Sequence, residues 1–284
     1  MRLSLLELPT LIRRALLVAG LPRGCVDAAA RLIGWAEIEQ GGALAWLERQ
    51  LPALAARPAG PVEAEPLAAG AVRLAGRQQS FLLTGPPALD MATAAARRQG
   101  VGATLVADSA GHPPLLALAD LAARRGLIGV VAFAGADGPR AATTLPDGSQ
   151  PWRFDWSGAE AGGLFAALVA AATGGLPWAG SLDALLALMR PPAAGGAADC
   201  SYAVLCADPA RFDGAGRIMA AMLVEIDQAK VDAGESHSPS DQAVRQALAL
   251  TEGIAVDAAL WLRLRAYGDR VLIPNSERSR QGAG

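Results

Sequence analysis

The sequence is poor in several residue types on which protein chemistry often depends. Lys230 is the only lysine and Asn275 the only asparagine, and the chain has two histidines and three cysteines. A Schiff base or a lysine-based phosphate site would therefore have to use Lys230. Because the cysteines form no closely spaced ligand pair and their number is odd, we expect reduced thiols. They are Cys25, Cys200 and Cys206.

An excess of charge and a membrane span are also lacking. The formal net charge is -2, so we expect neither nucleic acid nor a membrane as a partner. The stretch Ala161–Met189 has one charged residue, but it is rich in alanine and glycine and broken by Pro177, which favours a buried helix and a loop. The first twenty residues carry two arginines inside their apolar run and no signal cleavage site. We expect a cytoplasmic protein, and its Ala, Gly, Arg and Pro content is typical of a GC-rich bacterial genome.

The N-terminal part predicts a helical arm. Ser4 and Glu7 have the spacing of a capping box, which predicts a helix ending near Gly20, and two more helices are expected over residues 23–38 and 43–56. Three prolines between Arg57 and Pro66 indicate a linker. We therefore divide the chain into an arm (1–57), a linker (58–70) and an α/β core with a C-terminal helix pair (71–284).

The remainder mixes strands and helices, which predicts an α/β or α+β core. Apolar runs and turn residues indicate strands over residues 103–107, 127–133 and 201–206, an extended piece over 72–83, and a hairpin over 143–155. Helices are expected over residues 88–99, 115–125, 160–173, 214–229, 239–251 and 257–268.

Four segments resemble the type 2 malate/L-lactate dehydrogenase family. Gly100–Val131 is similar to the segment that carries the family's Ser-Asn-His motif, and Gly163-Leu164 is similar to its Lys-Gly-x-Gly-Leu helix. Tyr202–Phe212 resembles its strand ending in Asp-Pro, and Pro239–Leu264 resembles its C-terminal helix pair. The resemblance implies an α/β fold with a mixed sheet flanked by helices, an N-terminal helical arm, a dimer, and a nicotinamide cofactor held without the usual glycine fingerprint.

The chain departs from that family at the residues that would carry the chemistry. The resemblance implies a histidine and an arginine that handle the substrate after the second helix, but the matching residues, Ile38–Leu44, read IEQGGAL. The Ser-Asn-His motif becomes Ser109-Ala110-Gly111-His112, with Gly111 in the catalytic register unless a one-residue slip restores His112. The Lys-Gly pair becomes Glu160-Ala161. A cofactor-contacting stretch after Trp156 is absent, so the chain resembles a shortened relative.

Two residues remain candidates for chemistry. His112 lies at the turn after a strand, where an imidazole could pass a proton to a substrate carbonyl oxygen, and the alternative is a turn histidine bonded to a nearby carbonyl. Ser109 could bind a substrate carboxylate or phosphate, and the alternative is a helix cap. Asp108 is interpreted as a turn former and His237 as a solvated loop residue. Because the histidines are far apart and no acid has ligand spacing, we expect no metal.

Three functions remain open. The leading hypothesis is a divergent malate/L-lactate dehydrogenase-like protein with lost or strongly reduced nicotinamide-dependent activity, acting as a small-molecule binder or as the partner of an active enzyme. The first alternative is an active NAD(P)H-dependent reductase of a small 2-oxo acid or cyclic imine, with His112 as proton donor and Ser109 on the substrate. The second alternative is a non-enzymatic oligomer subunit that uses the apolar helices near residues 5–56. A cofactor, NAD(P)H, is expected only if the chain is active.

Overall fold

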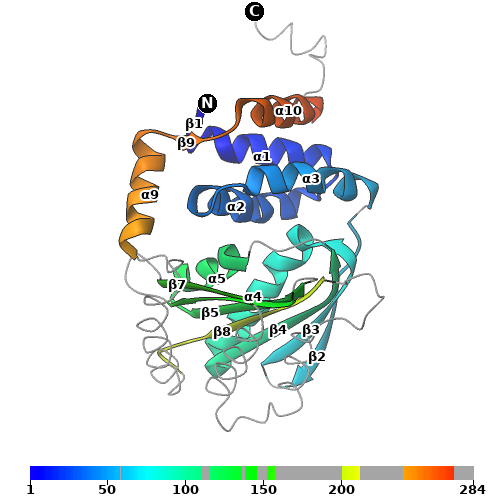
Figure 1. Cartoon of the computed structure of the whole chain (residues 1–284). Helices are drawn as coiled ribbons and strands as arrows, with labels where there is room; N and C mark the ends of the chain where they lie inside the picture. Colours follow the sequence, from blue (N-terminus) through cyan, green and yellow to red (C-terminus); the bar gives the residue numbers. More distant parts are fainter. Residues whose placement is uncertain are drawn as a thin grey trace, which may run out of the picture. The chain divides into compact units, whose positions relative to one another are not determined.

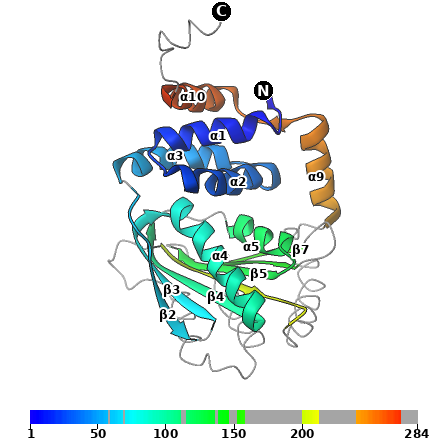
Figure 2. The ribbon, with the colours of Figure 1, turned by 180° about the vertical axis from the view of Figure 1, so that it is seen from behind.

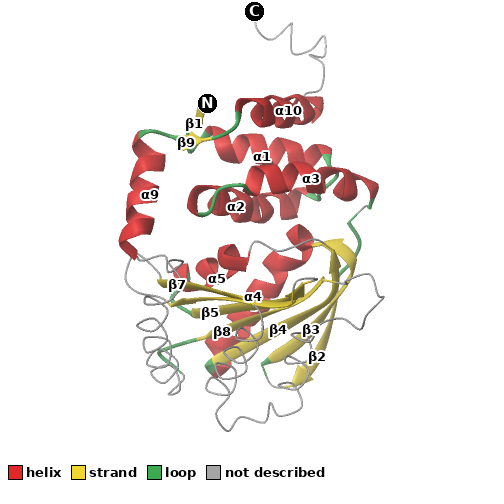
Figure 3. Ribbon diagram, viewed as in Figure 1, coloured by secondary structure: helices red, strands yellow, loops and turns green. Residues whose placement is uncertain are grey.

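The chain forms two compact units. A computed structural model describes residues 1–57, 59–68, 70–110, 115–135, 138–145, 152–157, 200–211 and 239–271 (Figure 1 and Figure 3). The first unit joins residues 1–59 to the chain from residue 245 onward, and the second contains residues 60–244. None of the described helices is long and apolar enough to cross a membrane.

The first unit is helical. It contains α1 (Glu7–Val18), α2 (Arg23–Glu39), α3 (Ala43–Ala56), most of α9 (Pro239–Thr251) and α10 (Ala258–Gly268), which runs into a short 3-10 turn (Asp269–Val271). The capping box is confirmed, because the Glu7 amide donates to Ser4 Oγ over 3.1 Å and the Ser4 amide donates to Glu7 Oε2 over 2.9 Å. Asp257 caps α10 as expected, accepting from the Leu260 amide over 2.7 Å.

The C-terminal helices belong to a different unit from the one expected. The sequence places them in the α/β core, whereas the structure groups them with the N-terminal arm. The physical reason is a short antiparallel pair between β1 (Arg2–Leu3) and β9 (Ile254–Ala255), extended by the Met1 amino group, which donates to the Val256 carbonyl over 2.9 Å. Gly268 completes the contact, because it lies against Arg14 of α1 with no room for a side chain.

The second unit is built on a mixed seven-stranded sheet in the order β2-β3-β4-β8-β5-β6-β7. β3 and β4 are parallel, and the other neighbouring strands are antiparallel. The strands are β2 (Glu63–Ala68), β3 (Ala71–Ser80), β4 (Val101–Ala110), β5 (Ile128–Gly135), β6 (Gly138–Leu145), β7 (Trp152–Ser157) and β8 (Cys200–Ala207). Helices α4 (Phe81–Gln99) and α5 (Leu115–Arg124) lie on one face of this sheet (Figure 1 and Figure 2).

Two expectations for this unit differ from the structure. The linker over residues 58–70 contains the edge strand β2, in which Pro66 is tolerated because an edge strand has one side without a partner. Helix α4 begins at Phe81 and includes Pro86 and Pro87, whereas the sequence predicted a start at residue 88. Complete burial of Phe81 and Leu82 offsets the backbone hydrogen bonds that the prolines cannot donate.

The hairpin expected over residues 143–155 is confirmed, because β6 and β7 pair antiparallel from Arg140 opposite Ser157 to Leu145 opposite Trp152. Its turn lies outside the described residues. The same holds for the helices expected over residues 160–173 and 214–229.

Two glycines and a cysteine let the helices lie close to the sheet. Gly102 of β4 and Gly129 of β5 are both paired with Cys206 of β8, so the three residues form one row across the sheet. A Cβ atom at Gly102 would overlap the Ala92 carbonyl oxygen of α4, and one at Gly129 would lie 2.5 Å from the Ala119 carbonyl oxygen of α5. The backbones of α4 and α5 therefore approach the sheet at the two glycines, on either side of the Cys206 side chain.

We predict that Gly102→Ala lowers the unfolding free energy by about 2–4 kcal/mol, because α4 must move away from the sheet. Gly24→Ala is the matched control, since Gly24 lies in helix α2 with no atom within 4 Å of an added Cβ, and we expect no loss there. Urea unfolding followed by circular dichroism measures both. Equal stability of the two variants would disprove the close contact.

We predict that the Cys206 thiol does not react in the folded protein. Burial raises the pKa of the Cys206 thiol to about 12, so at pH 8 its thiolate fraction is roughly a thousandfold below that of a free cysteine. A variant with Cys25→Ser and Cys200→Ser should consume a disulfide reagent only after unfolding. The control keeps half-buried Cys25 instead, with Cys200→Ser and Cys206→Ala. Fast labelling of native Cys206 would contradict its burial.

Candidate functional site

The carboxyl ends of β3 and β4 lie side by side, because these strands are parallel and Gln79 and Ser80 pair with Ser109 and Ala110. In open α/β sheets this end of parallel strands is where ligands collect. Helix α4 begins directly after β3, with Ser80 as its cap. His112 follows β4 but lies outside the described residues, as does His237, so both interpretations of His112 stay predictions.

Ser109 is a strand residue in the interior. It is 1% exposed, and its hydroxyl donates to the Gln79 carbonyl over 3.3 Å and hydrogen-bonds Thr84 Oγ1 over 3.1 Å. Tyr202 of β8 donates its hydroxyl to the same Thr84 oxygen over 2.8 Å. The interpretation of Ser109 as a helix cap is wrong, because β4 continues to Ala110 and α5 begins only at Leu115. Its role toward a substrate stays a prediction.

Left-handed backbone adjoins this hydroxyl network. Asp108 has a φ of 57°, and Arg77 and Gln78 opposite it have φ values of 50° and 59°. The pairing of β3 with β4 shifts at this point, and the Gln78 amide donates to the Asp108 carboxylate. Asp108 therefore lies at an irregularity inside strand β4, and not at a turn after the strand. Asp is a residue type enriched at positive φ, whereas Arg77 and Gln78 are not, so no sequence signal marked the left-handed backbone of β3.

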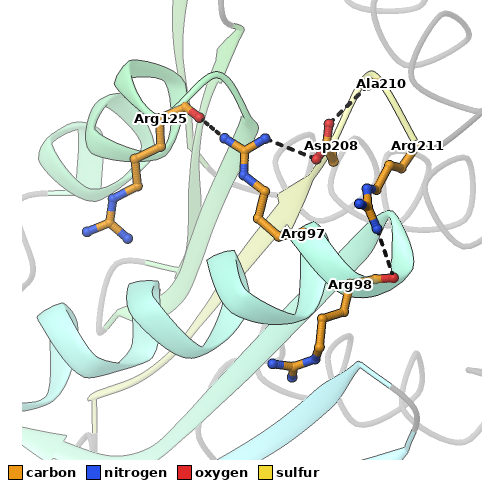
Figure 4. Close-up of polar contacts among 6 residues, drawn as sticks. All are labelled: Arg97, Arg98, Arg125, Asp208, Ala210 and Arg211. Atoms are coloured by element: carbon orange, nitrogen blue, oxygen red, sulfur yellow. Dashed lines mark hydrogen bonds and ion pairs between the residues drawn. The ribbon is translucent and has the colours of Figure 1, made fainter.

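An ion pair between Arg97 and Asp208 lies at the opposite end of β4. Asp208, at the end of β8, is 3% exposed, and Arg97 of α4 donates to its carboxylate over 3.1 Å (Figure 4). The same carboxylate accepts from the Ala210 amide over 3.0 Å, and the other end of the Arg97 guanidinium donates to the Arg125 carbonyl (Figure 4). These contacts tie α4 and the end of β8 to the end of α5, which is a structural role for the Asp-Pro turn.

A third group of polar residues lies at the α2–α3 turn in the first unit. Gly41 and Gly42 both have positive φ, which lets the chain reverse there. Glu37 is buried, and its carboxylate accepts from the Leu44 amide of α3 over 2.7 Å. Glu39 is 3% exposed.

Glu39 is contacted from α9. Its Oε1 accepts from Gln246 Nε2 over 2.7 Å, and its Oε2 lies 3.6 Å from Arg245 Nε. Sequence reasoning missed Arg245 because it is far from Glu39 along the chain. Among the described residues no cluster of histidine, cysteine or acidic side chains could hold a metal ion.

No protein-family model and no curated protein matches the sequence. Solved structures do match. Malate dehydrogenase from Pyrococcus horikoshii OT3 has 13% identity and a TM-score of 0.69, and the match covers 96% of both chains. Sulfolactate dehydrogenase from Methanocaldococcus jannaschii has 16% identity and a TM-score of 0.66, covering 95% of this chain and 97% of that one.

A reductase has the same architecture. Delta1-piperideine-2-carboxylate reductase from Pseudomonas syringae has 18% identity and a TM-score of 0.66, covering 94% of this chain and 99% of that one. The chain has the malate/lactate dehydrogenase fold. This confirms the resemblance found in the sequence, together with the expected mixed sheet and flanking helices. At such identities the malate/lactate dehydrogenase fold is what the likeness shows, and function has to be argued from the residues.

We predict that Ser109→Ala lowers the unfolding free energy by about 1 kcal/mol, because it leaves the buried Gln79 carbonyl without this donor. Thr104→Val is the matched control in the same strand: the Thr104 hydroxyl is buried and has no hydrogen-bond partner among the described residues, so its loss should cost nothing. Thermal and urea unfolding compare the two. An unchanged stability of the Ser109 variant would remove the structural role.

Proposed function

We propose that this protein is a divergent relative of the malate/L-lactate dehydrogenases with lost or strongly reduced nicotinamide-dependent activity, and that it acts as a small-molecule binder or as the partner of an active enzyme. The α2–α3 turn carries this proposal. The sequence resemblance implies a histidine and an arginine between residues 38 and 44, and this chain has two buried carboxylates at that turn, Glu37 and Glu39.

The chemistry of the turn supports a change of role. Reduction of a 2-oxo acid requires a cation for the substrate carboxylate and a proton donor at the carbonyl oxygen. Glu37 is used to bond the first turn of α3, and Glu39 is used to bond Gln246 of α9. These two carboxylates cannot provide the positive charge that a substrate carboxylate requires. A second observation also supports a change of role: the Ser109 hydroxyl is already hydrogen-bonded to Gln79 and Thr84.

A different observation favours the reductase alternative. The solved structures that match this chain are named as dehydrogenases of malate and sulfolactate and as a reductase of a cyclic imine carboxylate. In that case His112 would donate the proton, and NAD(P)H would supply the hydride. Turnover of a small 2-oxo acid or cyclic imine that disappears in His112→Ala, with the fold retained, would establish this alternative.

We predict that neither NADH nor NADPH binds tightly. Titration into the full chain, followed by nicotinamide fluorescence and by the melting temperature, should give no saturable change up to about 100 µM, the scale of ordinary substrate affinities. One of the malate/lactate dehydrogenases named above, measured alongside, provides the positive control. Saturable binding of either cofactor in the low micromolar range would overturn the proposal.

A further inference from the structure

Helix α9 presents its polar side to α2 and its apolar side to solvent. Gln246 donates to Glu39 Oε1 over 2.7 Å, and Arg245 Nε lies 3.6 Å from Glu39 Oε2. Among the described side chains of α9, Ala249 is the only buried apolar one. The larger apolar side chains are exposed, namely Val244, Leu248 and Leu250. Because a buried apolar face is what normally holds a helix of this length, α9 lacks the usual anchor.

The polar contact between α9 and α2 is incomplete. Both of its interactions end on one carboxylate, that of Glu39, whose side chain is 1% exposed. The Nε and Nη2 atoms of Arg245 are shielded from solvent and have no hydrogen-bond acceptor among the described residues. Shielded donors without an acceptor cost free energy. Movement of α9 away from α2 would return these donors to water and remove that cost.

Helix α10 in the same unit shows the opposite arrangement. Leu260 and Leu264 are buried, and Asp257 caps the first turn. The ion pair between Arg263 and Glu48 has both donors of the guanidinium edge filled. The apolar side chains therefore hold α10 in place, and its ion pair is an addition to them.

The chain directly after α9 is fixed. Gly253 has a φ of 77°, and a Cβ atom there would lie 2.7 Å from the Leu3 carbonyl oxygen. Ile254 pairs with Leu3 between β1 and β9, and Glu252 forms an ion pair with Arg2 over 2.7 Å. Because its C-terminal end is held in this way, α9 can move only by turning about that end, where a few residues absorb the change in φ and ψ.

We propose that α9 is a hinged cover over the end of α2, held closed by Glu39 and turning about Glu252 and Gly253. In the closed position the Glu39 carboxylate is buried, and in the open position it is accessible to solvent. The cover thus controls access to the α2–α3 turn, where the sequence resemblance implies the residues that handle substrate. The inference goes beyond the proposed function, because the opening of α9 does not depend on whether a nicotinamide cofactor binds.

Hydrogen exchange of the full chain, resolved along the sequence by mass spectrometry, measures the opening. We expect the amides of α9 to exchange at least about a hundredfold faster than those of α10. The exchange rate of α9 should stay nearly constant at low urea concentrations, because a local opening exposes little surface compared with global unfolding.

Glu39→Ala removes the group that holds the cover closed, so exchange in α9 should become about tenfold faster, while exchange in α10 stays unchanged. Glu48→Ala is the matched control. It removes the carboxylate that pairs with α10, and exchange in α10 should rise by less than about threefold, because Leu260 and Leu264 remain buried.

If Glu39→Ala does not fold, Gln246→Ala takes its place. It removes one of the two interactions with Glu39 from the half-buried side, and exchange in α9 should become several times faster. Equal protection of α9 and α10 in the wild-type chain would overturn the proposal. Unchanged exchange of α9 in whichever of the two variants folds would overturn it as well.

Discussion

Close packing of two helices on one row of the sheet is the constraint on which the second unit depends. Gly102, Cys206 and Gly129 lie side by side on β4, β8 and β5, and the backbones of α4 and α5 approach the two glycines. Thr93 of α4 lies 4.0 Å from the Cys206 sulfur, so the thiol fills the space between the helices. The same helix α4 carries Thr84 in its first turn, and the Thr84 hydroxyl connects Ser109 to Tyr202.

The two ends of β4 differ in the polar residues that surround them. At one end Asp208 and Arg97 close the structure with a buried carboxylate. At the other end, left-handed backbone at Asp108 and a buried network at Ser109 precede the segment that contains His112. In the first unit, Glu39 lies where the resemblance implied substrate chemistry. The chain therefore has the malate/lactate dehydrogenase fold, whereas the histidine and arginine that the resemblance implies at this turn are not in its sequence, and the fold alone does not specify a function.

Local signals in the sequence predicted the helices that the structure describes and most of the described strands. The capping box at Ser4 and the apolar runs of the sheet depend on neighbouring residues alone, and both were found. Prolines misled at Pro66, which an edge strand tolerates, and at Pro86, where burial of the first residues of α4 outweighed the lost hydrogen bonds. Ser109 was taken for a cap because strand β4 is longer than its apolar run. Arg245 could not be connected to the α2–α3 turn, because that contact exists only after folding brings α9 against α2.

A crystal structure grown with NADPH at millimolar concentration would test the central claim most directly. We expect no ordered dinucleotide. A nicotinamide ring held beside Ser109, at the carboxyl ends of β3 and β4, would contradict the claim.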